Sequence, residues 1–164
     1  MKTLYLMRHA KSSWSFDDLS DRERPLNDRG RDDAPRMGQA LAARHLTLDL
    51  IVSSPAVRAL STAVLVAREL KYPHDSIKVE PDIYEAEVAT LLAVINELPD
   101  AANSVLLTGH NPTITDVANH LSPSPLSGEM PTAGVLCLHF QTERWAEVQR
   151  ANAEFYFFDY PKNS

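Results

Sequence analysis

The sequence contains very little cysteine. Among its 164 residues the only one is Cys137. A single cysteine excludes an internal disulfide and any zinc site built from several thiolates. Its apolar neighbours Leu136 and Leu138 indicate a buried strand position. Because a chain without disulfides suits a reducing compartment, we expect the protein to be cytoplasmic.

Long hydrophobic runs and an excess of positive charge are also missing. No apolar stretch approaches the roughly 20 residues of a membrane-spanning helix. The first stretch, Leu4 to Met7, is interrupted by Arg8 and is too short for a secretory signal. The formal net charge is −6, and the arginines between Arg22 and Arg31 are interleaved with aspartates. The sequence therefore predicts no association with membranes or nucleic acid.

The overall composition is that of an ordinary globular protein. Hydrophobic residues make up 44% of the chain and charged residues 23%, close to the averages for folded domains. The length suits one domain with a core of its own and is too short for two. We expect one domain over residues 1–160, followed by a short C-terminal tail at 161–164.

Apolar strand patterns alternate with amphipathic helix patterns along the chain. Strands are expected at 3–7, 48–53, 77–80 and 104–108, and helices ending near 45, 70, 98 and 121. Pro35 lies inside the first helical pattern, so this helix either begins near Asp33 or is bent in its first turns. The next helix is expected to start at Pro55, with Ser54 as its N-cap.

The end of the chain is expected to form a β-hairpin. Its two strands are predicted at 135–140 and 146–152, and the aromatic residues at 155–158 are expected to hold the C-terminus against the core. Strands that alternate with helices predict a mainly parallel sheet covered on both faces, and the hairpin adds an antiparallel edge. The predicted fold class is therefore α/β, a single-domain three-layer α/β/α arrangement.

Basic residues follow three of the expected strands. Arg8 and His9 follow the first strand, Arg58 lies in the first turn of the helix after the second, and His110 follows the strand at 104–108. Parallel strands bring their carboxyl ends to one edge, where open α/β sheets bind ligands. Two arginines and two histidines there would suit a compact dianion such as a phosphoryl group. Each residue taken singly also has a plain structural role, as a surface or capping residue.

Four short segments of the sequence match a known pattern. They are Leu4-Tyr5-Leu6-Met7-Arg8-His9-Ala10-Lys11, Arg24-Pro25-Leu26-Asn27 with Gly30, Ser53-Ser54-Pro55-Ala56-Val57-Arg58-Ala59 with Thr62-Ala63, and Thr108-Gly109-His110-Asn111. Together they resemble the histidine phosphatase superfamily, and within it the small SixA-like branch of phosphohistidine phosphatases. The resemblance extends to Met130-Pro131-Thr132 and implies a phosphoglycerate-mutase-like fold.

The resemblance also implies roles for these residues. His9 would be the nucleophile that accepts the phosphoryl group, and Arg8, Arg58 and His110 would hold the phosphoryl oxygens. Arg24 would reach the rim of the site and help to hold the phosphate, and the plain alternative for it is a surface salt bridge with Asp21 or Asp28. The scheme requires no metal and no other cofactor.

Two positions depart from the family pattern. Relatives commonly have Arg-His-Gly and an asparagine a few residues later, whereas this chain continues with Ala10, Lys11 and Ser12. Lys11 or Ser12 would replace a phosphate contact, or both belong to a solvated loop. Larger relatives place a glutamate general acid between the second arginine and the second histidine. Glu85 is the match here, Glu87 is the competing choice, and a purely structural role at a helix start is the plain alternative for both.

The spacing between Arg58 and His110 bears on the substrate. The 51 residues between them are used up by the expected helices and strand, which leaves none for a lid. An open site suits a phosphoryl group carried by a protein. Phosphohistidine also needs little acid catalysis, because its imidazole leaving group takes up a proton at about pH 6.5. The sequence thus predicts a monomeric phosphatase whose substrate and partner is a phosphohistidine-bearing signalling protein.

Three other functions are alternatives to this prediction. A small-molecule phosphomonoesterase would use the same site. A mutase would need a closed site to keep water from the phosphoenzyme, and the sequence offers no residues to build one. A non-catalytic phosphate-binding module would typically have lost the nucleophile or an arginine, whereas His9, Arg8, Arg58 and His110 are all present.

Overall fold

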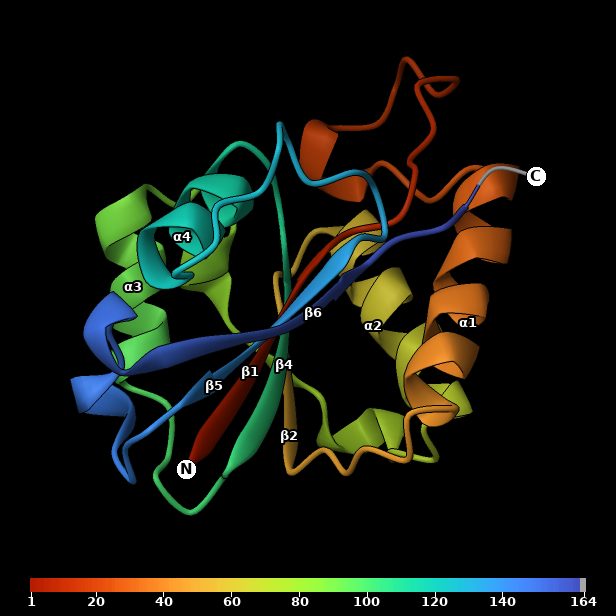
Figure 1. Ribbon diagram of the computed structural model, residues 1–164. Helices are drawn as coiled ribbons and strands as arrows, with labels where there is room; N and C mark the ends of the chain where they lie inside the picture. The colour runs from red at the N-terminus through yellow and green to blue at the C-terminus, as the bar shows by residue number, and fades with distance from the viewer. Residues whose placement is uncertain (163–164) are drawn as a thin grey trace.

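The computed structural model describes residues 1–162, and its centre is a six-stranded sheet in the order β3-β2-β4-β1-β5-β6 (Figure 1). Its strands are β1 (Lys2–Arg8), β2 (Leu50–Ser53), β3 (Lys78–Val79), β4 (Ser104–Gly109), β5 (Val135–Phe140) and β6 (Ala153–Asp159). Strands β3, β2, β4 and β1 run parallel, whereas β5 pairs antiparallel with both β1 and β6. The predicted α/β class, with a mainly parallel sheet and an antiparallel edge, is confirmed.

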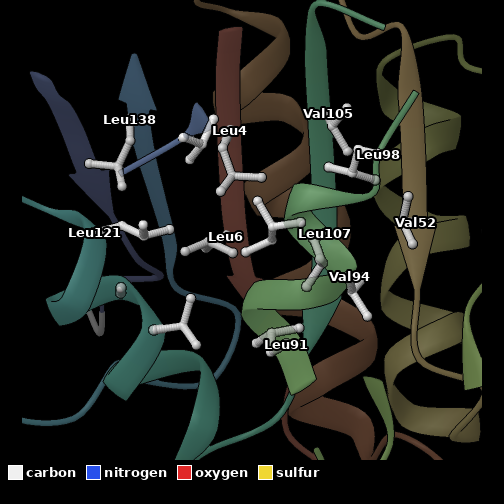
Figure 2. Packing of buried hydrophobic residues seen from close by; sticks show 14 of the residues in the cluster. Leu4, Leu6, Val52, Leu91, Val94, Leu98, Val105, Leu107, Leu121 and Leu138 are labelled. Atoms are coloured by element: carbon white, nitrogen blue, oxygen red, sulfur yellow. The ribbon is translucent and has the colours of Figure 1, made fainter. Parts of the chain in front are cut away.

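Helices cover both faces of the sheet (Figure 1). They are α1 (Asp28–Ala42) and α2 (Val57–Glu69) on one face, and α3 (Val88–Asn96) and α4 (Thr113–Leu121) on the other. Alternate side chains of β1 supply the two cores: Leu4 and Leu6 pack with α3 and α4, whereas Tyr5 and Met7 pack with α1 and α2. Figure 2 shows the first of these cores, where leucine and valine side chains of the strands meet those of the helices. The two-residue period of a strand thus produces the three layers.

The two central strands create the crevice in which a ligand can bind. β1 and β4 lie side by side, and Arg8 at the end of β1 pairs with Gly109 at the end of β4. The chain leaves β1 toward α1 on one face and leaves β4 toward α4 on the other. Neighbouring strands whose connections diverge in this way leave an opening at their carboxyl ends.

The predicted terminal hairpin is displaced along the chain. Residues 145–152 form two 3-10 turns rather than a strand, and the strand that pairs with β5 is β6, at 153–159. The reason is Trp145, which is fully buried and donates from its indole nitrogen to the carbonyl of Ala102 at 2.8 Å. This anchor holds the start of the segment away from β5, so the aromatic residues at 155–158 belong to the strand itself.

Two helix starts also differ from expectation. α1 begins at Asp28, because the side chain of Asn27 accepts a hydrogen bond from the Gly30 N–H at 2.8 Å and caps the helix. A start near Asp33 is therefore wrong, and Pro35 lies inside the helix. α2 begins at Val57 with Ala56 at the N-cap position, so Ser54 does not cap it as predicted.

The remaining expectations about the chain concern membranes, cysteine and the tail. No helix within residues 1–162 is long and apolar enough to cross a bilayer. Cys137 is buried in β5, as its apolar neighbours indicated. Of the predicted tail at 161–164, residues 163 and 164 lie outside the described residues.

Candidate active site

A cavity of about 680 Å³ lies at the carboxyl ends of β1 and β4. Of the nine candidate residues named from the sequence, all but Glu85 and Glu87 line it. The lining comprises Arg8, His9, Lys11, Ser12, Ser13, Trp14, Ser15, Arg24, Asn27, Arg58, His110, Asn111 and Thr132. The fold therefore brings the residues that follow β1, β2 and β4 into one cavity, as the pattern of strand ends predicted.

His9 is the first residue after β1 and is held by the main chain. Its Nδ1 lies 2.7 Å from the carbonyl oxygen of Ala10. A carbonyl can only accept, so Nδ1 carries the hydrogen and Nε2 is left with a free lone pair. Burial lowers the pKa of His9 to about 3, and the charges of Arg58 and Arg8 act in the same direction. The ring is therefore neutral near pH 7, which is the form that a nucleophile requires.

A threonine of α2 fixes the turn that carries His9. The Oγ1 of Thr62 accepts from the Ala10 N–H at 2.9 Å and donates to the Arg58 carbonyl at 2.7 Å. Thr62 is fully buried, so this hydroxyl is the partner that keeps the Ala10 amide satisfied inside the protein. It ties the end of β1 to the first turns of α2, which carry Arg58.

His110 faces His9 across the cavity, with ring centroids 5.2 Å apart. Its Nε2 lies 2.7 Å from the Oγ of Ser54, and that oxygen also accepts from the Ala56 N–H at 3.2 Å. Ser54 thus orients His110 instead of capping α2. Burial lowers the pKa of His110 to about 4, helped by the charge of Arg58. Like His9, it is neutral near pH 7.

Arg8 is oriented by the loop before β5. Its Nη1 donates to the carbonyl oxygen of Met130 at 3.0 Å, and the side-chain amide of Asn111 donates to the same oxygen at 3.0 Å. The Thr115 hydroxyl donates to Asn111 at 2.6 Å and accepts from the Met130 N–H at 3.0 Å. The strand end, the start of α4 and this loop are thereby joined on one side of the cavity.

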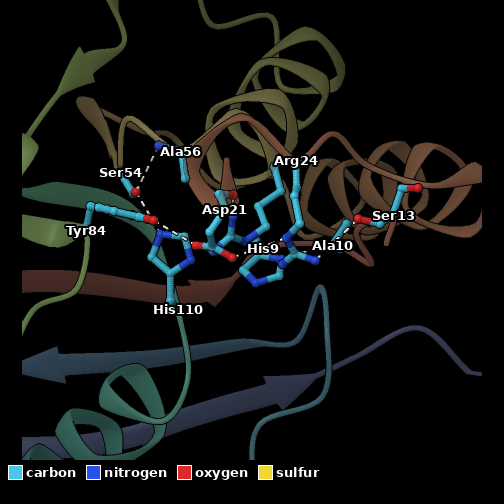
Figure 3. Close-up of polar contacts among 10 residues, drawn as sticks. His9, Ala10, Ser13, Asp21, Arg24, Ser54, Ala56, Tyr84 and His110 are labelled. Atoms are coloured by element: carbon cyan, nitrogen blue, oxygen red, sulfur yellow. Dashed lines mark hydrogen bonds and ion pairs between the residues drawn. The ribbon is translucent and has the colours of Figure 1, made fainter. Parts of the chain in front are cut away.

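Asp21 contacts two arginines of the cavity, and Figure 3 shows it beside Arg24 and Tyr84. Its carboxylate accepts from Arg58 Nη2 at 3.0 Å, from Arg24 Nε at 3.2 Å and from the Tyr84 hydroxyl at 2.7 Å. Its main-chain carbonyl accepts from Arg58 Nη1 at 2.6 Å. The hydrogen bond from Tyr84 and the nearby Arg58 lower the pKa of Asp21 to about 2. Asp21 is therefore a permanent anion that keeps both guanidinium groups in place.

These contacts show where Arg24 lies, whereas a phosphate contact by this residue stays a prediction. The residue forms the predicted salt bridge with Asp21, but it is also nearly buried and lines the cavity. It is therefore not a surface ion pair, and its salt bridge is what positions it at the rim. Two nitrogens of the other arginines, Arg8 Nε and Arg58 Nε, are buried without a partner in the described part of the chain. A buried N–H left unpaired costs about 1–3 kcal/mol, so a ligand with several acceptor oxygens would be stabilised here.

The loop between β1 and α1 forms the near wall of the cavity. Asn27 N–H donates to the Lys11 carbonyl at 3.0 Å, and Ser13 N–H donates to the Pro25 carbonyl at 2.8 Å. Gly30 is required at the start of α1, because a Cβ there would lie 2.1 Å from the Lys11 oxygen. Lys11 and Ser12 both line the cavity on this wall. A phosphate contact by either remains a prediction.

The structure does not bring Glu85 into the cavity. Glu85 is exposed on the connection before α3, where its backbone has a φ of 56°, and it is not among the lining residues. Glu87 is also exposed and is the N-cap residue of α3. Within residues 1–162 no carboxylate lines the cavity. General acid catalysis by Glu85 or Glu87 stays a prediction.

The contacts that four further residues make in this site were not foreseen from the sequence. The roles of Asp21, Ser54, Thr62 and Tyr84 come from contacts with residues far along the chain. Asp21 and Tyr84, for example, are 63 positions apart. The Asp21–Arg24 spacing of i, i+3 was the one local signal available. Concerning metals, residues 1–162 contain no group of three or more His, Cys, Asp or Glu side chains arranged to hold an ion.

Comparison with known proteins gives the chain a family context. The family model of the histidine phosphatase superfamily (branch 1) matches residues 4–91. An uncharacterized protein of Mycobacterium tuberculosis is 30% identical over 165 residues, which cover 95% of this chain and 100% of that relative. The matched region includes the strand end with Arg8 and His9 and the helix start with Arg58.

Two solved structures resemble the whole described fold. One, from Nakamurella multipartitia, is named as a candidate phosphohistidine phosphatase SixA. It is 26% identical with a TM-score of 0.83, covering 98% of this chain and 96% of that one. The other, from Agrobacterium tumefaciens, carries the same designation. It is 28% identical with a TM-score of 0.80, covering 98% of each chain. The phosphoglycerate-mutase-like fold expected from the sequence is confirmed.

Replacing Thr62 by valine tests whether its hydroxyl positions His9. Valine keeps the shape but leaves the Ala10 N–H buried and unpaired, so we expect a stability loss of about 1–3 kcal/mol. Displacement of His9 should lower kcat by about 10- to 100-fold. Denaturant unfolding and turnover measurements check both effects. Thr62→Ser retains the hydroxyl and is the matched control; equal losses in both variants would contradict the role of the hydrogen bond.

The titration of His9 is a second test. An unperturbed histidine is half protonated at about pH 6.5. Burial lowers the pKa of His9 to about 3 and that of His110 to about 4. Since the neutral form exists above the pKa, both rings should remain neutral from about pH 8 down to about pH 5. NMR titration of the imidazole C2–H signals, assigned with His9→Gln and His110→Gln, measures this directly. A His9 midpoint near 6.5 would refute it.

Proposed function

Because the chain belongs to the histidine phosphatase superfamily, we propose that it is a metal-independent phosphatase. It works through a phosphohistidine intermediate at His9 and removes phosphate from phosphohistidine on a protein. The observation that carries this proposal is the composition of the cavity wall. Four cationic side chains and two neutral imidazoles line it, and no carboxylate does, within the residues described.

The first half of the reaction transfers the phosphoryl group to His9. The Nε2 lone pair attacks phosphorus, the bond from phosphorus to the substrate nitrogen breaks, and its electron pair stays on the substrate imidazole. A phosphohistidine protonated on its other ring nitrogen leaves as neutral imidazole and needs no further proton. The Ala10 carbonyl supports this step, because it holds the hydrogen on Nδ1 of His9 at 2.7 Å and leaves Nε2 free.

The second half returns the enzyme to its starting state. Water attacks phosphorus, the bond from phosphorus to Nε2 breaks, and the electron pair returns to His9. The proton of the water passes to a phosphate oxygen or to solvent. Nδ1 keeps its hydrogen throughout, so His9 leaves as a neutral ring. In both halves Arg8, Arg58 and His110 would stabilise the charge on the equatorial oxygens, which is the main contribution of a protein to phosphoryl transfer.

The leaving group decides which substrates such a site can process. An alkyl phosphate releases an alkoxide, which needs a proton from a general acid. Asp21 is the carboxylate that contacts the cavity's arginines, and its pKa of about 2 keeps it ionised, so it has no proton to give. An imidazole leaving group avoids this requirement. The absence of an acid from the described wall thus favours phosphohistidine over alkyl esters.

The resemblance to solved structures supports the same substrate class. Both similar structures are named as candidate phosphohistidine phosphatases. A phosphohistidine on a protein can reach the cavity at the sheet edge, where Trp14 on its wall is largely exposed. The proposed partner is therefore a phosphohistidine-bearing signalling protein, and a monomer provides all the residues of the scheme.

The substrate proposal predicts a clear preference. Wild-type protein should release phosphate from a phosphohistidine-bearing phosphotransfer protein with a kcat/KM at least about 100-fold above that for an alkyl phosphomonoester, because only the latter needs an acid. His9→Ala should abolish both activities. Phosphate release and trapping of labelled phosphoenzyme are the measurements, and His139→Ala serves as a control outside the cavity.

Other outcomes would assign a different function. Preference for the monoester, lost in His9→Ala, would make the protein a small-molecule phosphomonoesterase with the same nucleophile. Phosphate or vanadate binding without turnover of any phosphorylated compound would leave a non-catalytic phosphate-binding module. Each of these results contradicts the proposed phosphohistidine phosphatase.

A further prediction concerns Glu85. Because this residue is exposed and does not line the cavity, Glu85→Gln should lower kcat on phosphohistidine by less than about threefold, well below the losses typical of a general acid. Steady-state kinetics on phosphohistidine and on an aryl phosphate check this, with Glu87→Gln in parallel. A loss as complete as that of His9→Ala would establish Glu85 as the general acid and contradict the leaving-group argument.

A further inference from the structure

Trp14 is the one large apolar side chain in the described wall of the cavity. The other lining residues are charged, hydroxyl, amide or imidazole groups. The relative exposure of Trp14 is 77%, whereas Trp145 is fully buried. Isolated exposed aromatic residues are common on protein surfaces, so exposure alone carries no meaning. The position of Trp14 beside the phosphoryl-binding arginines distinguishes it from the other exposed aromatic side chains.

The ring of Trp14 has a defined place. The guanidinium carbon of Arg24 lies 3.5 Å from the centre of the ring, in a cation–π contact. Arg24 in turn donates to Asp21 Oδ1 at 3.2 Å and to the Ser13 carbonyl at 3.3 Å. The Ser13 N–H in turn donates a hydrogen bond to the carbonyl oxygen of Pro25. Arg24 is thus held by Asp21 and by the main chain, whereas the indole contacts it through the ring alone.

We infer that Trp14 is a platform on which the leaving group of the substrate stacks. This inference rests on the proposed function and adds a specificity-determining residue to it. The cationic groups of the cavity can bind phosphoryl oxygens, but they provide no surface on which an aromatic ring could stack. The imidazole of phosphohistidine lies directly beyond its phosphorus and carries positive charge when protonated. Stacking of such a ring on indole is favourable both as an aromatic contact and as a cation–π contact.

The alternative is that Trp14 only packs against Arg24 and keeps it in place. The two roles predict different effects of Trp14 on different substrates. A residue that acts through Arg24 affects binding of the phosphoryl group and therefore every substrate equally. A residue that contacts the leaving group affects a substrate with a ring and spares a substrate without one.

Two small substrates with the same type of bond separate these roles. Free phosphohistidine and phosphoramidate both contain a phosphorus–nitrogen bond, but their leaving groups are imidazole and ammonia. Trp14→Ala should lower kcat/KM for phosphohistidine by about 3- to 10-fold, the size of one aromatic or cation–π contact. It should change kcat/KM for phosphoramidate by less than about twofold. The inhibition constant of vanadate should also change by less than about twofold.

Matched variants complete the experiment. Trp14→Phe retains a ring and should recover most of the loss on phosphohistidine. Phe16→Ala removes a neighbouring side chain that is half exposed and does not line the cavity, and it should leave both substrates unaffected. Equal losses of Trp14→Ala on both substrates, or no loss on either, would overturn the inference.

The test remains decisive if the proposed substrate is wrong. Wild-type protein that turns over neither these two substrates nor a phosphohistidine-bearing protein would refute the phosphohistidine function by itself. Phenyl phosphate and methyl phosphate then replace the pair, because their leaving groups differ in the same way. A Trp14→Ala loss confined to phenyl phosphate would still support the platform, and an equal effect on both esters would overturn it.

Discussion

Strands β1 and β4 lie side by side at the centre of the sheet, and their parallel register determines where the reactive groups are. Pairing of Arg8 with Gly109 ends both strands at the same height, so His9 and His110 emerge as neighbours with ring centroids 5.2 Å apart. A shift by one residue would turn the alternate side chains of β1 toward the wrong core. The hydrophobic packing that fixes the register therefore also fixes the distance between the two imidazoles.

A second level of organisation comes from the loop between β1 and α1. Asp21, in this loop, contacts Arg58 on α2, Arg24 on the loop itself and Tyr84 before α3. Positive side chains that converge on a cavity repel one another, and a single ionised carboxylate reduces this repulsion while it fixes their directions. The loop therefore positions the arginines of the cavity even though Asp21 does not line it.

The sequence predicted those features that depend on local patterns. Apolar runs located β1, β2 and β4, and the basic residues after them located the cavity, because strand direction alone sets which ends meet. The prediction of a strand at 146–152 was wrong, because burial of Trp145 against Ala102 is a tertiary contact with no local signature. The hydrogen bonds between Ser54 and His110 and between Ala10 and Thr62 were not predicted for the same reason, because the partners lie 56 and 52 positions apart.

His9 takes its orientation from a main-chain carbonyl rather than from a side chain. In a catalytic triad the histidine depends on a carboxylate, which one base change in the gene can remove. Every residue has a carbonyl, so the partner of His9 at position 10 survives any substitution that fits its buried site. Ala10 is fully buried, so what selection must preserve there is a small side chain and not a functional group. The orientation of His9 thus depends on the path of the main chain, and a substitution at position 10 removes no side-chain contact with the imidazole.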